Sequence, residues 1–235
     1  MIEHATKASE APWKAQAIQP ERFVYEVIAP RASTRVERER WDDVYDCWQT
    51  VWGQTLRDLD GAGVVFSDDL TRQHELGCLF YSGRCIGMTA WRWVDLSLRA
   101  ERDDSYFKAW PRAVLESAFT AGQRVCIGSN LTVLPAWRGA VDGYSIKELL
   151  MVLAVKRFLA SDADVMVGTM RNDRGMNGLV YRLGAMPLSR DVAHHGVAVD
   201  LVTFTRGALG PFEPRPQTDA LAQRLWKEAL ARETT

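Results

Sequence analysis

Hydrophobic and polar positions in the first half of the chain predict a strand, a long helix and a hairpin. From Glu37 to Leu59, aromatic and aliphatic residues recur at three- and four-residue steps with charged residues between them, as on an amphipathic helix. This segment is one long helix, or two short helices that break near Gly53. Phe23 to Ile28 alternates as a strand does, and His74–Tyr81 and Cys85–Val94 are strand-like segments around a short glycine-containing loop.

Strands and helices alternate in the second half of the chain. Apolar and β-branched residues predict strands at Val125–Val133, Val165–Met170 and Val197–Thr205. Amphipathic spacing predicts helices at Ser145–Ala160 and Gly175–Leu183 between these strands. The fold class is therefore α/β in the broad sense (α+β), built around one sheet.

The pattern indicates one domain between two terminal segments. Residues 1–21 are polar and alanine-rich, and we expect a flexible arm there. Residues 22–210 hold the alternating strands and helices, and residues 211–235 form a proline-punctuated linker and a last amphipathic helix.

Composition narrows the classes of function. The 235 residues are 47% hydrophobic, which is enough for a substantial core. The 29 basic and 30 acidic side chains give a net charge of -1, so no chain-wide field favours nucleic acid or anionic lipid. The four cysteines lack metal or redox spacing and predict reduced core residues, and we expect no metal site. With no membrane-spanning apolar run and no signal-peptide core at the N-terminus, the expected location is cytoplasmic.

Two segments carry the candidate chemistry. In the first, the strand ending at Val133 leads through a glycine-bearing turn at Arg138–Gly143 into a helix, and such a turn can hold a phosphate with backbone amides. In the second, Tyr181 lies at the end of a short helix, where its hydroxyl can supply a proton. The alternatives are an ordinary strand, turn and helix with Arg138 in solvent, and a tyrosine that only packs.

These two segments resemble the GNAT acyltransferase superfamily, over roughly residues 22–205. The turn resembles its Arg/Gln-x-x-Gly-x-Gly/Ala motif, with Val141 at the first motif glycine and Asp142 beside it. The second segment resembles its Leu-Tyr-x-x-x-Gly-Phe ending, here from Val180 to Ala185. The resemblance implies a single domain with a mixed, mostly antiparallel sheet flanked by helices, and an acyl-CoA or acyl carrier protein as co-substrate.

The resemblance also implies roles for individual residues. Tyr181 would protonate the departing thiolate, and Ser129 or Asn130 would line the acceptor site. Asn172 and Asn177 would bind the pantetheine arm or cap the short helix. The donor would lie along two further stretches, the strand end for its amides and the turn for its phosphates: Leu131, Thr132, Val133, Arg138, Gly139, Ala140, Val141, Asp142, Gly143, Tyr144 and Ser145.

The general base is left open by the sequence. The fourth strand carries no acid where some relatives have a catalytic carboxylate. Water-linked candidates elsewhere are His74, Glu75, Asp95 and the pair His194 and His195, and each has a surface or structural role as its alternative.

The stretch Asp95–Arg124, between the third and fourth strands, is long and predicts an extra helix after Pro111. Such an insertion resembles that of acyl-homoserine-lactone synthases and long-chain N-acyl amino acid synthases. The resemblance implies an N-acyltransferase that moves an acyl group from a CoA or carrier-protein thioester to a small amine such as an amino acid. The alternatives are a non-catalytic acyl-thioester binder or sensor, and an interaction module. Acyl length, CoA versus carrier protein and oligomeric state are left open.

Overall fold

A seven-stranded sheet forms the centre of the protein in the computed structural model, which describes residues 18–30, 34–61 and 65–233. Its strand order is β1-β2-β3-β4-β7-β9-β8, in which the β4–β7 pair is parallel and the other pairs are antiparallel. The predicted mixed, mostly antiparallel sheet is therefore confirmed. The strands are β1 (Phe23–Ile28), β2 (Glu75–Tyr81), β3 (Arg84–Asp95), β4 (Arg124–Val133), β7 (Val165–Arg171), β8 (Met186–His194) and β9 (Val197–Thr205).

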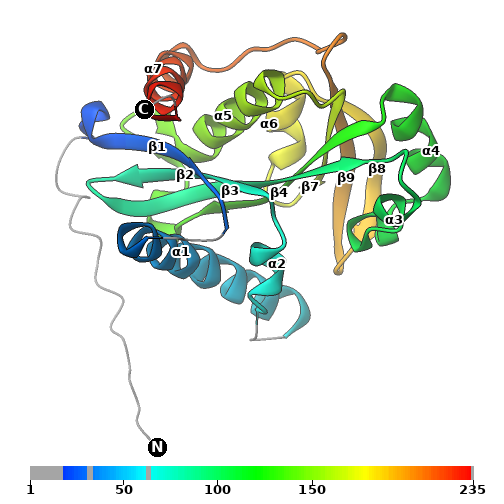
Figure 1. Ribbon diagram of the computed structural model, residues 1–235, viewed down its shortest axis with the longest axis horizontal. Coiled ribbons are helices and arrows are strands. Elements are labelled where there is room, and N and C mark those ends of the chain that lie inside the picture. Colours follow the sequence, from blue (N-terminus) through cyan, green and yellow to red (C-terminus); the bar gives the residue numbers. More distant parts are fainter. Residues whose placement is uncertain (1–17, 31–33, 62–64, 234–235) are drawn as a thin grey trace, which may run out of the picture.

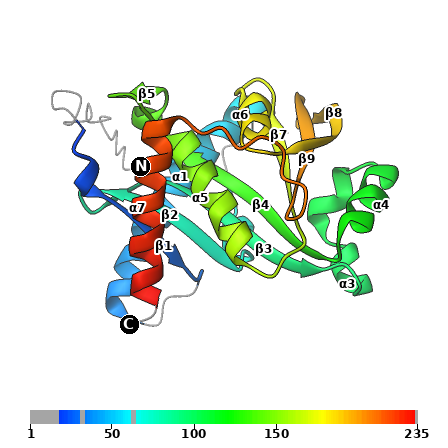
Figure 2. The same ribbon diagram turned by 90° about the horizontal axis from the view of Figure 1, so that it is seen from above.

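Helices cover both faces of this sheet. In Figure 1, α5 and α7 lie on one face, and α1 and α2 lie on the other. The view from above in Figure 2 shows α3 and α4 at the far end of the sheet, away from α7. The helices are α1 (Arg35–Asp60), α2 (Asp68–Thr71), α3 (Arg99–Arg102), α4 (Arg112–Ala121), α5 (Ile146–Ala160), α6 (Met176–Arg182) and α7 (Pro216–Glu233).

The long helix α1 is continuous through Gly53, so the two-helix alternative is wrong. It begins at a capping box, in which Thr34 accepts from the Glu37 backbone N–H and the Glu37 side chain accepts from that of Thr34. It ends at Gly61, whose φ of 67° suits a residue without a side chain. Its apolar stripe, including Val44 and Trp48, is buried against β2 and β3.

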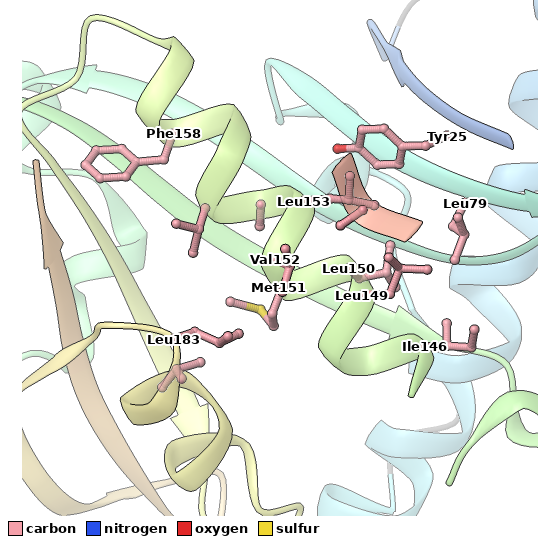
Figure 3. Packing of buried hydrophobic residues seen from close by; sticks show 14 of the residues in the cluster. Tyr25, Leu79, Ile146, Leu149, Leu150, Met151, Val152, Leu153, Phe158 and Leu183 are labelled. Carbon is pink, nitrogen blue, oxygen red and sulfur yellow. The ribbon is translucent and has the colours of Figure 1, made fainter. Parts of the chain in front are cut away.

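The main core lies between the sheet and α5. Leu149, Leu150, Val152 and Leu153 are all fully buried, because sheet, α6 and α7 surround this helix. Figure 3 shows these side chains between the strands and Leu183 after α6. The C-terminal helix belongs to the same core, with Leu221 and Leu225 buried in it.

The structure also contains elements that the sequence analysis missed. The edge strand β8 was not expected, and it pairs with β9 with two register irregularities. The insertion between β3 and β4 holds the predicted helix α4, but also α3 and a 3-10 turn, Ser105–Ala109. Most of the expected N-terminal arm lies outside the described residues.

The four cysteines are buried free thiols, as the sequence predicts. Burial raises the pKa of Cys78 and Cys126 well above the usual range. Across the ranges 18–30, 34–61 and 65–233, no helix has the length and hydropathy needed to cross a membrane.

The split between β4 and β7 is the feature that positions the site. Their parallel ladder pairs Val125–Ile127 with Val165–Val167. Both strands continue beyond the ladder, to Val133 and Arg171. On this length each strand keeps its outer neighbour, β3 or β9, while its inner edge faces the opening between them.

Candidate active site

A first cavity, of about 510 Å³, occupies the split and is called cavity 1 here. Its walls come from β4 and β7 beyond their ladder, and from Met151 and Ala154 of α5. It is also lined by Val51 and Thr55 of α1, so it passes from the α5 side of the sheet to the α1 side. A slender ligand can therefore cross the sheet here.

A second cavity, of about 800 Å³, lies on the α1 side and is called cavity 2. Trp48 and Leu56 of α1 form part of its wall, and Val199 and Leu201 of β9 form another part. Tyr106 and Trp110 of the insertion close it. The insertion between β3 and β4 thus forms part of the wall of a cavity large enough for a small molecule.

The two cavities share a wall at the point where β4 and β7 separate. The residues that line both are Trp52, Gly128, Ser129, Asn130, Thr169 and Arg171. The two cavities therefore adjoin at these residues. A reaction between two bound molecules needs their sites to adjoin in this way.

A bulge in β4 shapes the shared wall. The register against β3 shifts between Met88 and Ala90, and Asn130 takes a left-handed φ of 53°. Consecutive strand residues normally point to opposite faces, but Ser129 and Asn130 both reach partners on the α1 side. The Ser129 hydroxyl bonds Gln73 at 3.4 Å, and the Asn130 amide oxygen accepts from the Trp48 indole at 3.2 Å.

A second polar cluster surrounds Asp200 of β9, which is 2% exposed. Its carboxylate accepts from the Tyr181 hydroxyl at 2.6 Å, from Asn172 at 3.0 Å, from Asn177 at 3.1 Å and from the Asp191 backbone N–H at 2.9 Å. Burial alone would raise the pKa of Asp200, but these hydrogen bonds outweigh it and hold the pKa at about 2. The carboxylate is therefore ionised at neutral pH.

The hydroxyl of Tyr181 is held by this carboxylate. Burial and the hydrogen bond to Asp200 raise the pKa of Tyr181 to about 12. Loss of its proton would place two negative oxygens side by side, which disfavours donation to a thiolate. Tyr181, Asn172, Asn177 and Asp200 lie outside the linings of both cavities.

Solved structures of other proteins share this architecture. FeeM, an N-acyl amino acid synthase from uncultured soil microbes, matches with a TM-score of 0.56 at 12% identity, over 79% of this chain and 91% of that one. The CoA-dependent acyl-homoserine lactone synthase BjaI, solved with SAM and isopentyl-CoA, matches with a TM-score of 0.53 at 15% identity, over 86% and 89%. A mosquito arylalkylamine N-acetyltransferase-like protein matches with a TM-score of 0.57 at 10% identity, over 78% and 99%.

This protein has a GNAT-like fold. Neither a protein-family model nor a curated protein matches its sequence. The GNAT-like order of elements runs from β1 to β9, and the split between β4 and β7 lies within it.

The turn expected to bind phosphate is a small hairpin in this GNAT-like fold. β5 (Ala140–Val141) pairs with β6 (Tyr144–Ser145) around Asp142 and Gly143, whose φ angles are 49° and 83°. Two positive φ angles are typical of a type I′ turn, and the Asp-Gly dipeptide was the signal for it. The Asp142 carboxylate accepts from the Ile18 backbone N–H, and the Ser145 hydroxyl caps α5.

Two residues of the expected phosphate segment line cavity 1, Arg138 and Gly139. Asp142, Gly143, Tyr144 and Ser145 lie outside both linings. Burial and the neighbouring Arg174 lower the pKa of Arg138, so two cations lie close together beside cavity 1. Lys147 of α5 is a third, and its ammonium donates to the Arg174 carbonyl at 3.2 Å.

The expected strand end lies along cavity 1 as well. Leu131 and Val133 line it, while Thr132 lies outside its lining. The Thr132 hydroxyl accepts from the Trp52 indole at 3.0 Å and donates to the Asn130 carbonyl at 2.8 Å. On the neighbouring strand β3, Thr89 is 4% exposed and lines cavity 1. Its hydroxyl has no hydrogen-bond partner among the described residues.

The histidine pair is the one set of expected bases that lines a cavity. His194 and His195 border cavity 2. Glu75 instead forms a two-pronged ion pair with Arg157, at 2.8 and 2.7 Å. His74 accepts from the Trp93 backbone N–H at 3.1 Å, and Asp95 accepts from that of Ser97 at 2.8 Å. Within residues 18–30, 34–61 and 65–233, no three His, Cys, Asp or Glu side chains group as metal ligands.

Tyr106 is among the site residues that the sequence analysis missed. Tyr106 of the insertion lines cavity 2, and its hydroxyl lies 3.3 Å from the Thr169 hydroxyl on the shared wall. Burial raises the pKa of Tyr106 to about 12, so the hydroxyl is protonated. No motif marked this tyrosine, because it reaches the site from an insertion that does not belong to the core order of elements.

Proposed function

We propose that the protein is an N-acyltransferase that moves an acyl group from a CoA or acyl-carrier-protein thioester to a small amine such as an amino acid. The observation that supports it best is the wall shared by cavities 1 and 2 at the β4 bulge. FeeM is described as an N-acyl amino acid synthase and BjaI as CoA-dependent, and both share the fold. The reaction class follows from this combination of fold and paired cavities.

The donor occupies cavity 1 in this proposal. Its phosphates lie near Arg138, Lys147 and Arg174, whose positive charges favour them. Its pantetheine amides lie along the inner edge of β4, at Leu131 and Val133. The thioester then reaches the shared wall, where Ser129 and Asn130 present polar groups.

The acceptor occupies cavity 2 and attacks directly. Its amine nitrogen adds to the thioester carbonyl carbon, a C–N bond forms, the C–S bond breaks, and the thiol leaves with a proton that the amine loses. Backbone N–H groups near the bulge are candidates for stabilising the carbonyl oxygen. The charged side chains that line cavity 2 are Arg72, Arg92, Lys108, Arg171 and Asp69, and each of the three arginines is ion-paired with an aspartate.

The test is direct. Purified protein is incubated with acyl-CoAs and acyl carrier proteins of graded chain length and with a panel of amines and amino acids. Free thiol and N-acyl product are followed by a thiol reagent and mass spectrometry. Stoichiometric release of thiol with amide product supports the proposal, and no release with any pair sinks it.

The non-catalytic binder or sensor is the second candidate. It is favoured by the way Asp200 holds the hydroxyl of Tyr181, the expected proton donor. Calorimetry that shows donor binding with no turnover in the panel above supports the sensor and contradicts the enzyme.

A further inference from the structure

Cavity 2 contains a buried arginine whose hydrogen-bonding capacity is only partly used. Arg92 of β3 is 8% exposed and lines the cavity. Its Nη2 donates to Asp104 at 2.6 Å, while its Nε has no hydrogen-bond partner among the described residues. A buried donor without an acceptor costs free energy, and this one belongs to a residue that lines the cavity.

Two other arginines of the chain make the contrast clear. Arg157 bonds both oxygens of Glu75 through Nε and Nη2, and Arg40 does the same with Glu26, at 3.2 and 2.8 Å. Asp104 accepts only one hydrogen bond from Arg92, at the Oδ1 that also accepts from the Tyr106 backbone N–H at 2.7 Å as the cap of the 3-10 turn. Neither Glu75 nor Glu26 borders cavity 2.

The surroundings of Arg92 favour an anion. Arg72 lies close enough to lower the pKa of Arg92, after burial itself. Arg72 also lines cavity 2, where its guanidinium contacts Asp69 and Ser105, each at 3.1 Å. The guanidinium fork matches a planar carboxylate, and the apolar wall from Val199 and Leu201 strengthens such a pair by excluding water.

We propose that cavity 2 selects an acceptor that carries a carboxylate as well as its amine, and that Arg92 binds this carboxylate through Nε. The inference rests on the proposed acyl transfer and deepens it, because it names the group that distinguishes an amino acid from a simple amine. Arg92 lies on β3, which pairs with β4 at the bulge, with Ile127 as its register partner. Its neighbours on β3, Trp91 and Ala90, pair with Gly128 and Ser129 of the shared wall.

The experiment compares acids with their amides. For wild type and R92M, kcat/KM is measured with leucine and leucinamide, and with phenylalanine and phenylalaninamide, at one pH. We expect the acid-to-amide ratio to fall by about tenfold or more in R92M, as for loss of a charged hydrogen bond. A ratio unchanged by R92M overturns the inference and leaves acyl transfer standing.

Further variants separate recognition from folding. R92M leaves Asp104 without its partner, so the double variant R92M/D104N is measured as well, and we expect it to show the same fall in the ratio with a recovered melting temperature. D104N alone keeps the guanidinium and should keep the preference for acids. R72M is the matched control for a general charge effect, and a fall as large as that of R92M contradicts a specific Nε contact.

A binding measurement makes the inference independent of turnover. Calorimetry with N-acyl-leucine and N-acyl-leucinamide tests Arg92 even where no acyl transfer is found. Tighter binding of the acid by wild type than by R92M supports the carboxylate subsite, and equal binding contradicts it. Tighter binding of the matched N-acyl aminophosphonate than of the acid also contradicts it, because the subsite would then suit a larger, more highly charged anion.

Discussion

Two polar clusters lie near the split between β4 and β7, and only one of them borders a cavity. Ser129 and Asn130 form part of the wall shared by two cavities. The cluster around Asp200 uses Tyr181, Asn172 and Asn177 to satisfy one buried carboxylate and lies outside both linings. The sequence predicted site residues in both clusters, but only Ser129 and Asn130 border the cavities.

The sharpest way to break this comparison is to block the shared wall. A Cβ at Gly128 would meet the Met166 sulfur at 3.5 Å, an ordinary contact, so alanine fits there. We expect Gly128→Phe to lower kcat/KM by about 100-fold or more, because a ring at the wall separates donor from acceptor. Thiol release measures this, with Gly128→Ala as the matched control. An active, folded Gly128→Phe protein would show that the reaction takes place elsewhere.

The Asp200 cluster should matter to stability and to its pH dependence. The pKa of Asp200 is lowered to about 2, so its contribution is present above the unfolded-state pKa near 4 and is lost as pH falls through 2. We expect Asp200→Asn to lower the free energy of unfolding by about 2 kcal/mol at pH 7. Urea unfolding from pH 7 to pH 2 should show the difference from wild type shrinking between pH 4 and pH 2. A difference that stays constant over this range contradicts the ionised cluster.

The fold was predictable from the sequence to the extent that it depends on hydrophobic pattern. The strands at Phe23–Ile28 and Val197–Thr205 were expected within the observed bounds, because their residues alternate or run apolar over a strand's length. β8 was missed because it is an edge strand of mixed polar and apolar residues, none of them buried. Its place depends on pairing with β9, which local pattern does not record.

The sequence predicted those site residues whose contact with a cavity depends only on their position along the backbone. Leu131 and Val133 line cavity 1 because they follow the strand to its end. A motif predicted the role of Tyr181. Asp200, which accepts the hydrogen bond of the Tyr181 hydroxyl, lies on a strand 19 residues later and belongs to no motif. Arg92 and Tyr106 had no motif at all; Arg92 reaches cavity 2 from β3, and Tyr106 reaches it from the insertion.

The two tyrosines offer a matched pair for the same comparison. We expect Tyr106→Phe to reduce kcat by about tenfold, because its hydroxyl lies 3.3 Å from the hydroxyl of Thr169, a residue of the shared wall. Tyr181→Phe should lower the free energy of unfolding by about 1 kcal/mol and leave kcat within about threefold of wild type. Single-turnover kinetics and urea unfolding measure the two effects. A 100-fold fall in kcat for Tyr181→Phe would instead support the proton-donor role that the sequence predicts.

The smallest effects on the free energy of unfolding should come from two buried threonines near the bulge. The effects of replacing them should have opposite signs. Thr132 accepts from Trp52 and donates to the Asn130 carbonyl, so Thr132→Val leaves an indole N–H without its acceptor and should cost about 1 kcal/mol. Thr89 has no partner among the described residues, so Thr89→Val removes an unsatisfied buried hydroxyl from the wall of cavity 1. The free energy of unfolding of Thr89→Val should therefore rise by less than about 1 kcal/mol. Its affinity for the acyl donor should fall, because an amide or carbonyl of the acyl donor can hydrogen-bond to the Thr89 hydroxyl. Urea unfolding without ligand and calorimetry with the acyl donor measure the pair, and equal stability losses for both valine variants would show that the Thr89 hydroxyl is satisfied in the free protein.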